Sequence, residues 1–265
     1  MKTLISKSLL LTFVILSGYG YISSCTHEDI TPPEPVSTKP VITRGTNIHL
    51  PGKITVGNKN EWKLDKAHSS VLWQTNYVGA AGLLTGRFNQ FGMHNVENAR
   101  MTSYTTTGQP LADSSWAFYE SEPAKTYFNG YVQMNTSNTG EPGRDAGCNI
   151  TALGTTPIVA GTQNLTVTNL AKIRSTKVEF DPLTSDYIAT IELTWKGNLA
   201  APLTKTIVGK LKYISKGTIG AGTASTYDVF GLQLSFQFNC RDFGITSTSI
   251  SDKIEIQCNM NFNNK

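Results

Sequence analysis

The strongest constraint on the fold of this chain is a strict alternation of apolar and polar residues toward its C-terminal end. Between Phe230 and Phe238 every second residue is phenylalanine or leucine, and Ile254 to Phe262 again alternates apolar with polar residues. A period of two residues is typical of a β-strand with one dry face and one wet face. Each stretch therefore predicts a long strand whose apolar side chains face an interior.

The same alternation recurs from Trp62 onward, which predicts at least seven or eight strands in all. Examples are Val71, Trp73 and Tyr77 on one face, and Ile191, Leu193 and Trp195 on another. Strands this long either stack as two sheets or close into a barrel, and closure removes exposed sheet edges. We find no convincing ten-residue helical period, so the chain is predicted to be all-β and antiparallel.

The first 24 residues read as a targeting segment rather than as part of the fold. Lys2 and Lys7 precede a short apolar run, and Ile22-Ser23-Ser24-Cys25 resembles the lipobox at which bacterial lipoproteins are cleaved and acylated. Residues 1–24 are therefore predicted to be a lipoprotein signal peptide and Cys25 a lipidated membrane anchor. The alternative is ordinary secretory cleavage that leaves Cys25 as a spare thiol.

Residues 25–60 are expected to form a flexible tether, because prolines such as Pro32, Pro33, Pro35 and Pro40 interrupt them and little apolar periodicity appears. Residues 61–265 then form the barrel domain. Thr26, directly after the cysteine, resembles the sorting signal of outer-membrane lipoproteins. The expected location is the cell envelope, at the outer membrane, with the domain facing either the periplasm or the cell surface.

Charge and cysteine content exclude some partners and pairings. The net charge is +4, and loss of Lys2 and Lys7 leaves 21 basic against 19 acidic residues, which gives no reason to expect nucleic-acid binding. Cys148, Cys240 and Cys258 cannot all pair with one another. Cys240 and Cys258 are predicted to be buried free thiols.

Five patches of sequence, in order, resemble the YceI family of periplasmic proteins. They are Trp62-Lys63-Leu64-Asp65 with His68-Ser69, Gly86-Arg87-Phe88 with Phe91-Gly92, Arg144-Asp145, Leu193-Thr194-Trp195-Lys196-Gly197, and Arg241-Asp242-Phe243-Gly244-Ile245. The resemblance implies an eight-stranded antiparallel lipocalin-like barrel that encloses a polyisoprenoid chain. The chain departs from the family pattern after Arg144-Asp145 and in the enlarged stretch from Pro110 to Lys125.

The expected ligand is an apolar isoprenoid, quinone-like or acyl lipid held in the barrel lumen. The predicted lumen residues are Val71, Trp73, Tyr77, Leu84, Phe88, Phe128, Val132, Met134, Ile191, Leu193, Trp195, Ile207, Leu211, Phe230, Leu232, Leu234, Phe236, Ile254 and Ile256. Each methylene buried there would contribute about 0.8 kcal/mol. We expect a bulky residue at Gly86 to reduce lipid uptake without unfolding the barrel.

Polar contacts to a headgroup are expected at the mouth of the barrel, with His94, Arg87 and Arg144 as candidates. The pairs Arg144-Asp145 and Arg241-Asp242 are more simply explained as turn-stabilising residues. The alternative to a carrier is a structural or adhesive surface lipoprotein with a solid core and an exposed aromatic patch. Such a patch would include Trp116, Phe118 and Tyr119.

No catalytic or metal site is predicted. The chain has four histidines and none of the common hydrolase, metalloprotease or nucleotide-binding motifs. Asp65 and His68 could approach each other at the start of a strand, and a structural hydrogen bond is the simpler interpretation. The sequence leaves the oligomeric state open, a homodimer included.

Overall fold

The computed structural model describes residues 49–51, 62–77, 82–93, 116–120, 122–146 and 170–265. The chain divides into two compact units, residues 1–39 and 40–265, and all described residues belong to the second. The predicted signal peptide, Cys25, most of the tether, His94 and Cys148 lie outside the described residues.

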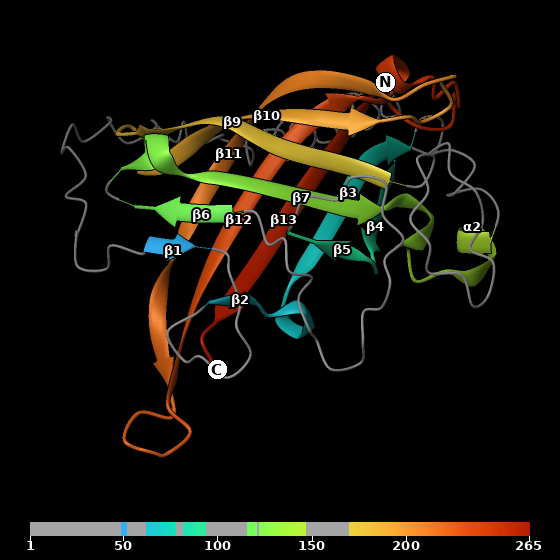
Figure 1. The fold of residues 1–265 in the computed structure, drawn as a ribbon. Helices are drawn as coiled ribbons and strands as arrows, with labels where there is room; N and C mark the ends of the chain where they lie inside the picture. Colours follow the sequence, from blue (N-terminus) through green and yellow to red (C-terminus); the bar gives the residue numbers. More distant parts are fainter. Residues whose placement is uncertain (1–48, 52–61, 78–81, 94–115, 121, 147–169) are drawn as a thin grey trace, which may run out of the picture. The chain divides into compact units, whose positions relative to one another are not determined.

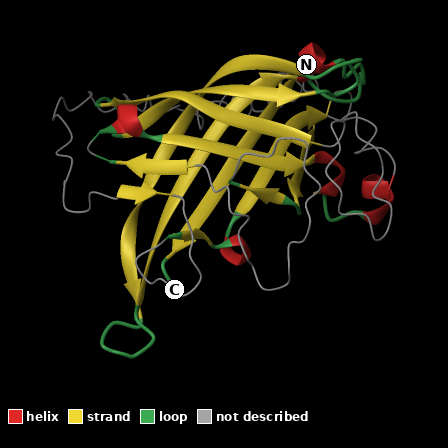
Figure 2. Ribbon diagram, viewed as in Figure 1, coloured by secondary structure: helices red, strands yellow, loops and turns green. Residues whose placement is uncertain are grey.

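The described part of the chain consists of β-strands joined by turns and short helices (Figure 1, Figure 2). The strands are β1 (His49–Pro51), β2 (Lys63–Leu64), β3 (Ser70–Tyr77), β4 (Gly82–Phe88), β5 (Phe91–Gly92), β6 (Trp116–Tyr119), β7 (Tyr127–Gln133), β8 (Ser137–Asn138), β9 (Leu170–Asp181), β10 (Asp186–Trp195), β11 (Leu203–Ile219), β12 (Tyr227–Asn239) and β13 (Lys253–Asn263). The helices are η1 (Lys66–His68), η2 (Pro123–Lys125), η3 (Met134–Thr136), α2 (Pro142–Ala146) and η4 (Cys240–Phe243).

All strands belong to one antiparallel sheet, which confirms the predicted all-β fold. The strand order is β1-β6-β7-β9-β10-β11-β12-β13-β3-β4-β8, with β2 added to β13 and β5 added to β7. The sheet is open but strongly curled, and short ladders join β5 to β7 and β8 to β4 (Figure 1). Each of these closing ladders has only two residue pairs, so the barrel is incompletely closed.

The described residues form thirteen strands where eight were predicted, and the difference has local causes. A bend at Asn89 and Gln90 divides one long segment into β4 and β5, and η3 divides another into β7 and β8. The short strands β1, β2 and β6 are additional. Eight long segments still form the circuit, so the lipocalin-like class of the prediction holds. β1 lies within the segment expected to be the tether.

The register of the longest strands places their apolar residues against one another. Leu232 pairs with Met260 and Leu234 pairs with Cys258 between β12 and β13, and all four are buried. Alternation in the sequence therefore becomes a continuous apolar inner surface across neighbouring strands. The β11–β12 hairpin continues past the rest of the sheet to a turn at residues 220–226 (Figure 1).

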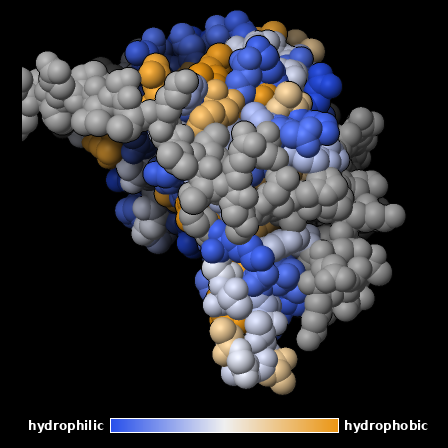
Figure 3. Space-filling model, turned by 90° about the vertical axis from the view of Figure 1, so that its left-hand side faces the viewer, coloured by the Kyte–Doolittle hydropathy of each residue, from blue (hydrophilic) through white to orange (hydrophobic). Residues whose placement is uncertain are grey.

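The outer surface is mixed in character. On the face seen in Figure 3, hydrophobic residues form small groups between hydrophilic ones. Trp116 and Phe118 are buried, with 2% and 1% of their surface exposed, so the exposed aromatic patch considered above is not formed by them.

Candidate functional site

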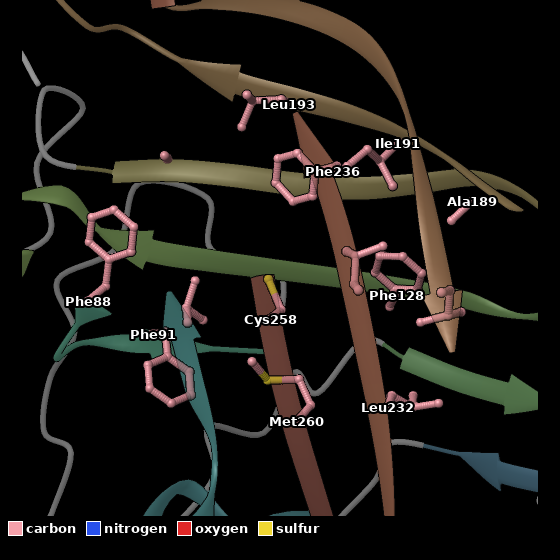
Figure 4. Packing of buried hydrophobic residues seen from close by; sticks show 14 of the residues in the cluster. Phe88, Phe91, Phe128, Ala189, Ile191, Leu193, Leu232, Phe236, Cys258 and Met260 are labelled. Carbon is pink, nitrogen blue, oxygen red and sulfur yellow. The ribbon is translucent and has the colours of Figure 1, made fainter. Parts of the chain in front are cut away.

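The interior of the curled sheet holds an apolar cavity of about 90 Å³. Side chains from β4, β7, β10, β12 and β13 converge on this region (Figure 4). The lining residues are Val71, Trp73, Phe88, Phe91, Gly92, Met93, Phe128, Gly130, Tyr131, Val132, Met134, Ala171, Ile173, Leu193, Trp195, Leu211, Leu232, Leu234, Phe236, Phe238, Ile254, Ile256, Cys258 and Met260. None of these described lining residues carries a formal charge at neutral pH.

Aromatic rings fill the interior beside the ends of β12 and β13 where Phe230 pairs with Phe262. These two rings stack with their centroids 4.7 Å apart. Trp62 meets Phe230 edge-on at 4.9 Å and Trp116 lies 4.6 Å from Phe262. Aromatic contacts of this kind stabilise packing beyond the area that they bury. This part of the interior is therefore solid.

A second aromatic group lies at the opposite end of β12, where η4 folds against the sheet. Trp195 lies 5.3 Å from Phe243 and 6.2 Å from Phe238, measured between ring centroids. Gly197 has a positive φ of 52°, and a Cβ there would lie 2.2 Å from the carbonyl oxygen of Phe243. The glycine thus permits the close approach that brings η4 onto Trp195.

Most of the predicted lumen residues line the cavity. They are Val71, Trp73, Phe88, Phe128, Val132, Met134, Leu193, Trp195, Leu211, Leu232, Leu234, Phe236, Ile254 and Ile256. Of the remainder, Ile191 and Phe230 are buried in the surrounding core, and Leu84 and Ile207 pack against it partly exposed.

Tyr77 is the one residue of the predicted set that faces solvent, with 42% of its surface exposed. It occupies the last position of β3 and bridges to Ile250 in the segment before β13. Its alternation partners Val71 and Trp73 are buried. Placing Tyr77 in the lumen was wrong, because β3 continues beyond the part of the interior that the sheet encloses.

Several lining residues were absent from the predicted set. They are Phe91, Gly92, Met93, Gly130, Tyr131, Ala171, Ile173, Phe238, Cys258 and Met260. Phe238, Cys258 and Met260 belong to the alternating stretches already recognised, so the sequence carried a signal for them. Phe91, Gly92 and Met93 follow a bend, where too few residues remain for a period of two to appear.

The candidate headgroup residues that the structure describes do not line the cavity. Arg87 is exposed and belongs to a hollow of about 1010 Å³ on the other face of the sheet, together with Gln74, Lys210 and Glu255. Arg144 is exposed on α2. Because side chains in a strand alternate between faces, the burial of Phe88 itself directs Arg87 outward.

One member of each Arg-Asp pair stabilises a turn, which agrees in part with the simpler interpretation. The guanidinium of Arg241 donates hydrogen bonds to the carbonyl oxygens of Ile245, Ser247 and Ile250 at 2.8 to 2.9 Å. These bonds hold the connection between η4 and β13. Asp145 accepts hydrogen bonds from the backbone and side chain of Thr139.

Asp65 and His68 form the expected hydrogen bond, with 2.8 Å between the carboxylate and Nδ1. Asp65 also accepts from the His68 backbone and from the side chain of Asn263, so it fixes η1 to β13. Burial alone would raise the pKa of Asp65, but the hydrogen bonds from His68 and Asn263 bring it below its usual value. The His68 side chain is 76% exposed, and neither residue lines the cavity.

Lys66 is a residue beside the cavity that the sequence did not indicate. Its ammonium lies 5.1 Å from the ring centroid of Phe91, which is a cavity residue. Burial lowers the pKa of Lys66 to about 7.

Cys258, which faces the cavity directly, is a free thiol whose pKa burial raises to about 12. Cys240 is also free and buried, which confirms the prediction for both cysteines.

Within the described ranges we find no helix long and apolar enough to cross a membrane. The same residues contain no group of three or more histidine, cysteine or acidic side chains placed to hold a metal ion.

Comparisons with solved structures show weak overall similarity. BcnA of Burkholderia cenocepacia matches with 13% identity and a TM-score of 0.44, over 75% of this chain and 99% of that one. A polyisoprenoid-binding domain from Saccharophagus degradans matches with 13% identity and a TM-score of 0.41, over 76% and 97%. The YceI protein of Campylobacter jejuni matches with 18% identity and a TM-score of 0.46, over 77% and 98%. No curated protein matches.

The sequence profile of the family described as YceI-like domain matches residues 62–262. This range contains the eight long segments of the sheet, except for the last residue of β13, and every residue that lines the cavity. It also contains the five sequence patches that carried the resemblance. The chain therefore belongs to the YceI-like domain family.

Proposed function

We propose that this protein binds the apolar chain of an isoprenoid or acyl lipid in its barrel, without catalysis, while tethered to the bacterial envelope. The observation that carries the proposal is the apolar interior cavity, to which eight long segments of the sheet contribute a lining without formal charge. An apolar chain needs few polar contacts there, because its transfer from water provides the binding free energy.

The comparisons support the same ligand class. The chain belongs to the YceI-like family, and one of its structural neighbours is described as a polyisoprenoid-binding domain. The hollow on the other face of the sheet is larger, but Arg87, Lys210 and Glu255 are among its lining residues. Charged and amide groups are poor neighbours for a hydrocarbon chain, so the interior cavity is the better binding site.

The size of the cavity sets a condition on binding. Pockets for small molecules usually measure about 300–1,000 Å³, and the interior cavity of about 90 Å³ is smaller. Lipid entry must therefore displace side chains of the lining. Met93, Met134 and Met260 are suited to this, because methionine is unbranched and changes rotamer at little cost.

The test is native mass spectrometry of the full chain, purified gently from a bacterial envelope. We expect a discrete adduct with the mass of an isoprenoid or acyl lipid. A clean ligand-free mass, together with no uptake of added prenyl lipid, would contradict the proposal. That result would favour the alternative of a solid-cored surface lipoprotein.

A matched pair of variants connects the adduct with the cavity. Ala171 is a small, buried lining residue at the start of β9, and Ala171→Phe adds a ring where the lipid would lie. Thr206→Phe adds the same ring at an exposed position of β11. We expect the first variant to lose at least about tenfold in lipid loading, since a few lost apolar contacts suffice for that. The second variant should load normally.

A further inference from the structure

Two tryptophan side chains line the cavity, and they differ in how their indole N–H groups are satisfied. The Nε1 of Trp73 donates a hydrogen bond of 2.8 Å to the hydroxyl of Ser137. The Nε1 of Trp195 is buried and has no hydrogen-bond partner among the described residues. The whole Trp195 side chain is 1% exposed, so bulk water does not satisfy this donor.

The surroundings of Trp195 offer little that could accept its hydrogen. The two rings packed against it belong to Phe238 and Phe243, at 6.2 and 5.3 Å between centroids. Most of the other described residues of the cavity lining are aliphatic or aromatic. A buried donor without an acceptor is destabilising, and native proteins rarely keep one unless it has a role.

We propose that Trp195 is the polar anchor of the lipid site, and that its indole N–H donates to a neutral oxygen carried by the ligand. This inference rests on the proposed function. It narrows the ligand class to apolar chains that carry a carbonyl, ester or hydroxyl oxygen, such as a prenyl ketone, quinone or alcohol. A pure hydrocarbon would leave the donor unsatisfied.

The same wall argues against an anionic group at this position. None of the described residues that line the cavity is charged, and the ammonium beside the cavity, that of Lys66, lies against Phe91. A phosphate at Trp195 would therefore have no counterion in the cavity wall. A prenyl diphosphate would therefore have to keep its headgroup outside the cavity. Neutral oxygen-bearing chains can bring their polar end to Trp195, and diphosphates cannot.

The experiment compares wild type with Trp195→Phe, which keeps an aromatic ring while it removes the donor and reduces the size of the ring. Three probes are titrated into each full-length protein: farnesylacetone, which has a ketone; phytane, a hydrocarbon; and farnesyl diphosphate. We expect the variant to bind farnesylacetone about tenfold more weakly, and to bind phytane with a much smaller loss that reflects only the smaller ring. Farnesyl diphosphate should bind wild type more weakly than farnesylacetone does.

Infrared spectroscopy gives a readout that a purely structural role of Trp195 would not produce. The carbonyl stretch of isotopically labelled farnesylacetone should move to lower wavenumber on binding wild type, and this shift should be absent with Trp195→Phe. Trp116→Phe is the matched control, because Trp116 is a buried tryptophan that does not line the cavity. It should lower stability and leave the carbonyl shift in place.

The outcomes separate the two proposals. Equal loss of ketone and hydrocarbon binding in Trp195→Phe, or an unchanged carbonyl stretch, would overturn the anchor while lipid binding stands. Failure of wild type to bind any of the three probes would overturn lipid binding, and the anchor with it.

Discussion

At the scale of single residues, burial shifts the pKa values of two side chains, Cys258 and Lys66. Cys258 belongs to a regular alternating strand, yet full burial raises the pKa of its thiol to about 12. The reactive species of cysteine is the thiolate, whose fraction at pH 8 would then be on the order of one in 10⁴. Its position in the cavity wall makes it a reporter of whether the interior opens.

We predict that Cys258 resists alkylation at pH 8 in the folded protein, because it is both inaccessible and protonated. The measurement is the rate of maleimide labelling in a variant that keeps Cys258 as its only cysteine, with and without urea. A second variant with Thr206→Cys as its only cysteine gives the rate of an exposed thiol. Comparable rates in native conditions would show that the interior is open to solvent.

Burial of the charged Lys66 side chain lowers the free energy of unfolding by an amount that depends on pH. Its pKa is about 7 in the folded protein and about 10.5 in the unfolded chain, so the folded state binds fewer protons between these values. The free energy of unfolding therefore rises with pH through this window, and the cost is fully present below pH 7. Solvent reaches the partly exposed side chain, which reduces the cost to on the order of 1–2 kcal/mol.

We predict that Lys66→Met stabilises the protein at pH 6 by that amount and has a much smaller effect at pH 11, above the pKa of the unfolded lysine. Methionine keeps the contact with Phe91 apolar and removes the charge. Urea unfolding at the two pH values measures the difference. Lys253→Met, at an exposed site on β13, should show no such dependence. A stabilisation that is equal at both pH values would refute this explanation.

At the scale of elements, the weakest part of the fold is the seam where the sheet closes. Trp73 of β3 lies over Gly86 of β4, so closely that a Cβ at Gly86 would be 2.6 Å from the indole ring. The same indole reaches past β4 to Ser137 of β8. One side chain thus connects three neighbouring strands where the backbone ladder between β4 and β8 has only two residue pairs.

We predict that Gly86→Ala destabilises the protein by about 1–3 kcal/mol, because the added methyl group displaces Trp73. This corrects the expectation that a bulky residue at Gly86 would act on lipid uptake alone, since Gly86 does not line the cavity. Gly217→Ala in β11 is the control, because its Cβ would meet only Val229 at 3.8 Å. Denaturant unfolding gives the free energy of unfolding of both variants. Equal values for Gly86→Ala and Gly217→Ala would count against the role of the seam.

At the scale of the whole molecule, the proposed carrier needs an attachment separate from its barrel. The face seen in Figure 3 is mixed in polarity, and the proposed lipidation of Cys25 would supply a separate membrane anchor. Two or three acyl chains on one residue hold a protein stably on a membrane. The barrel itself then remains free to exchange its ligand.

We predict that Cys25→Ala moves the protein from the membrane fraction to the soluble fraction, because acylation requires that thiol. Fractionation of bacterial envelopes, followed by mass measurement of the N-terminal residue, tests this. Cys148→Ala should leave the distribution unchanged. Retention of the Cys25 variant on membranes would mean that another part of the chain holds it there.

The sequence by itself determined the all-β class, the faces of the long strands and the family. These follow from local rules: side chains of a strand alternate, and β12 and β13 are long enough for the alternation to be unambiguous. It also predicted the free thiols and the turn-stabilising role of Arg241, because both depend on short stretches of chain.

Only the tertiary structure decided how much of the interior is filled and which polar groups face it. Phe230 and Trp195 belong to equally regular strands, yet one stacks on Phe262 and the other lines the cavity. Tyr77 lies on the same face of β3 as Val71 and Trp73, yet its side chain is exposed to solvent. The reason is that β3 extends beyond the part of the interior that the sheet encloses. Such outcomes depend on which distant strands meet, and alternation along one strand carries no information about its neighbours across the barrel.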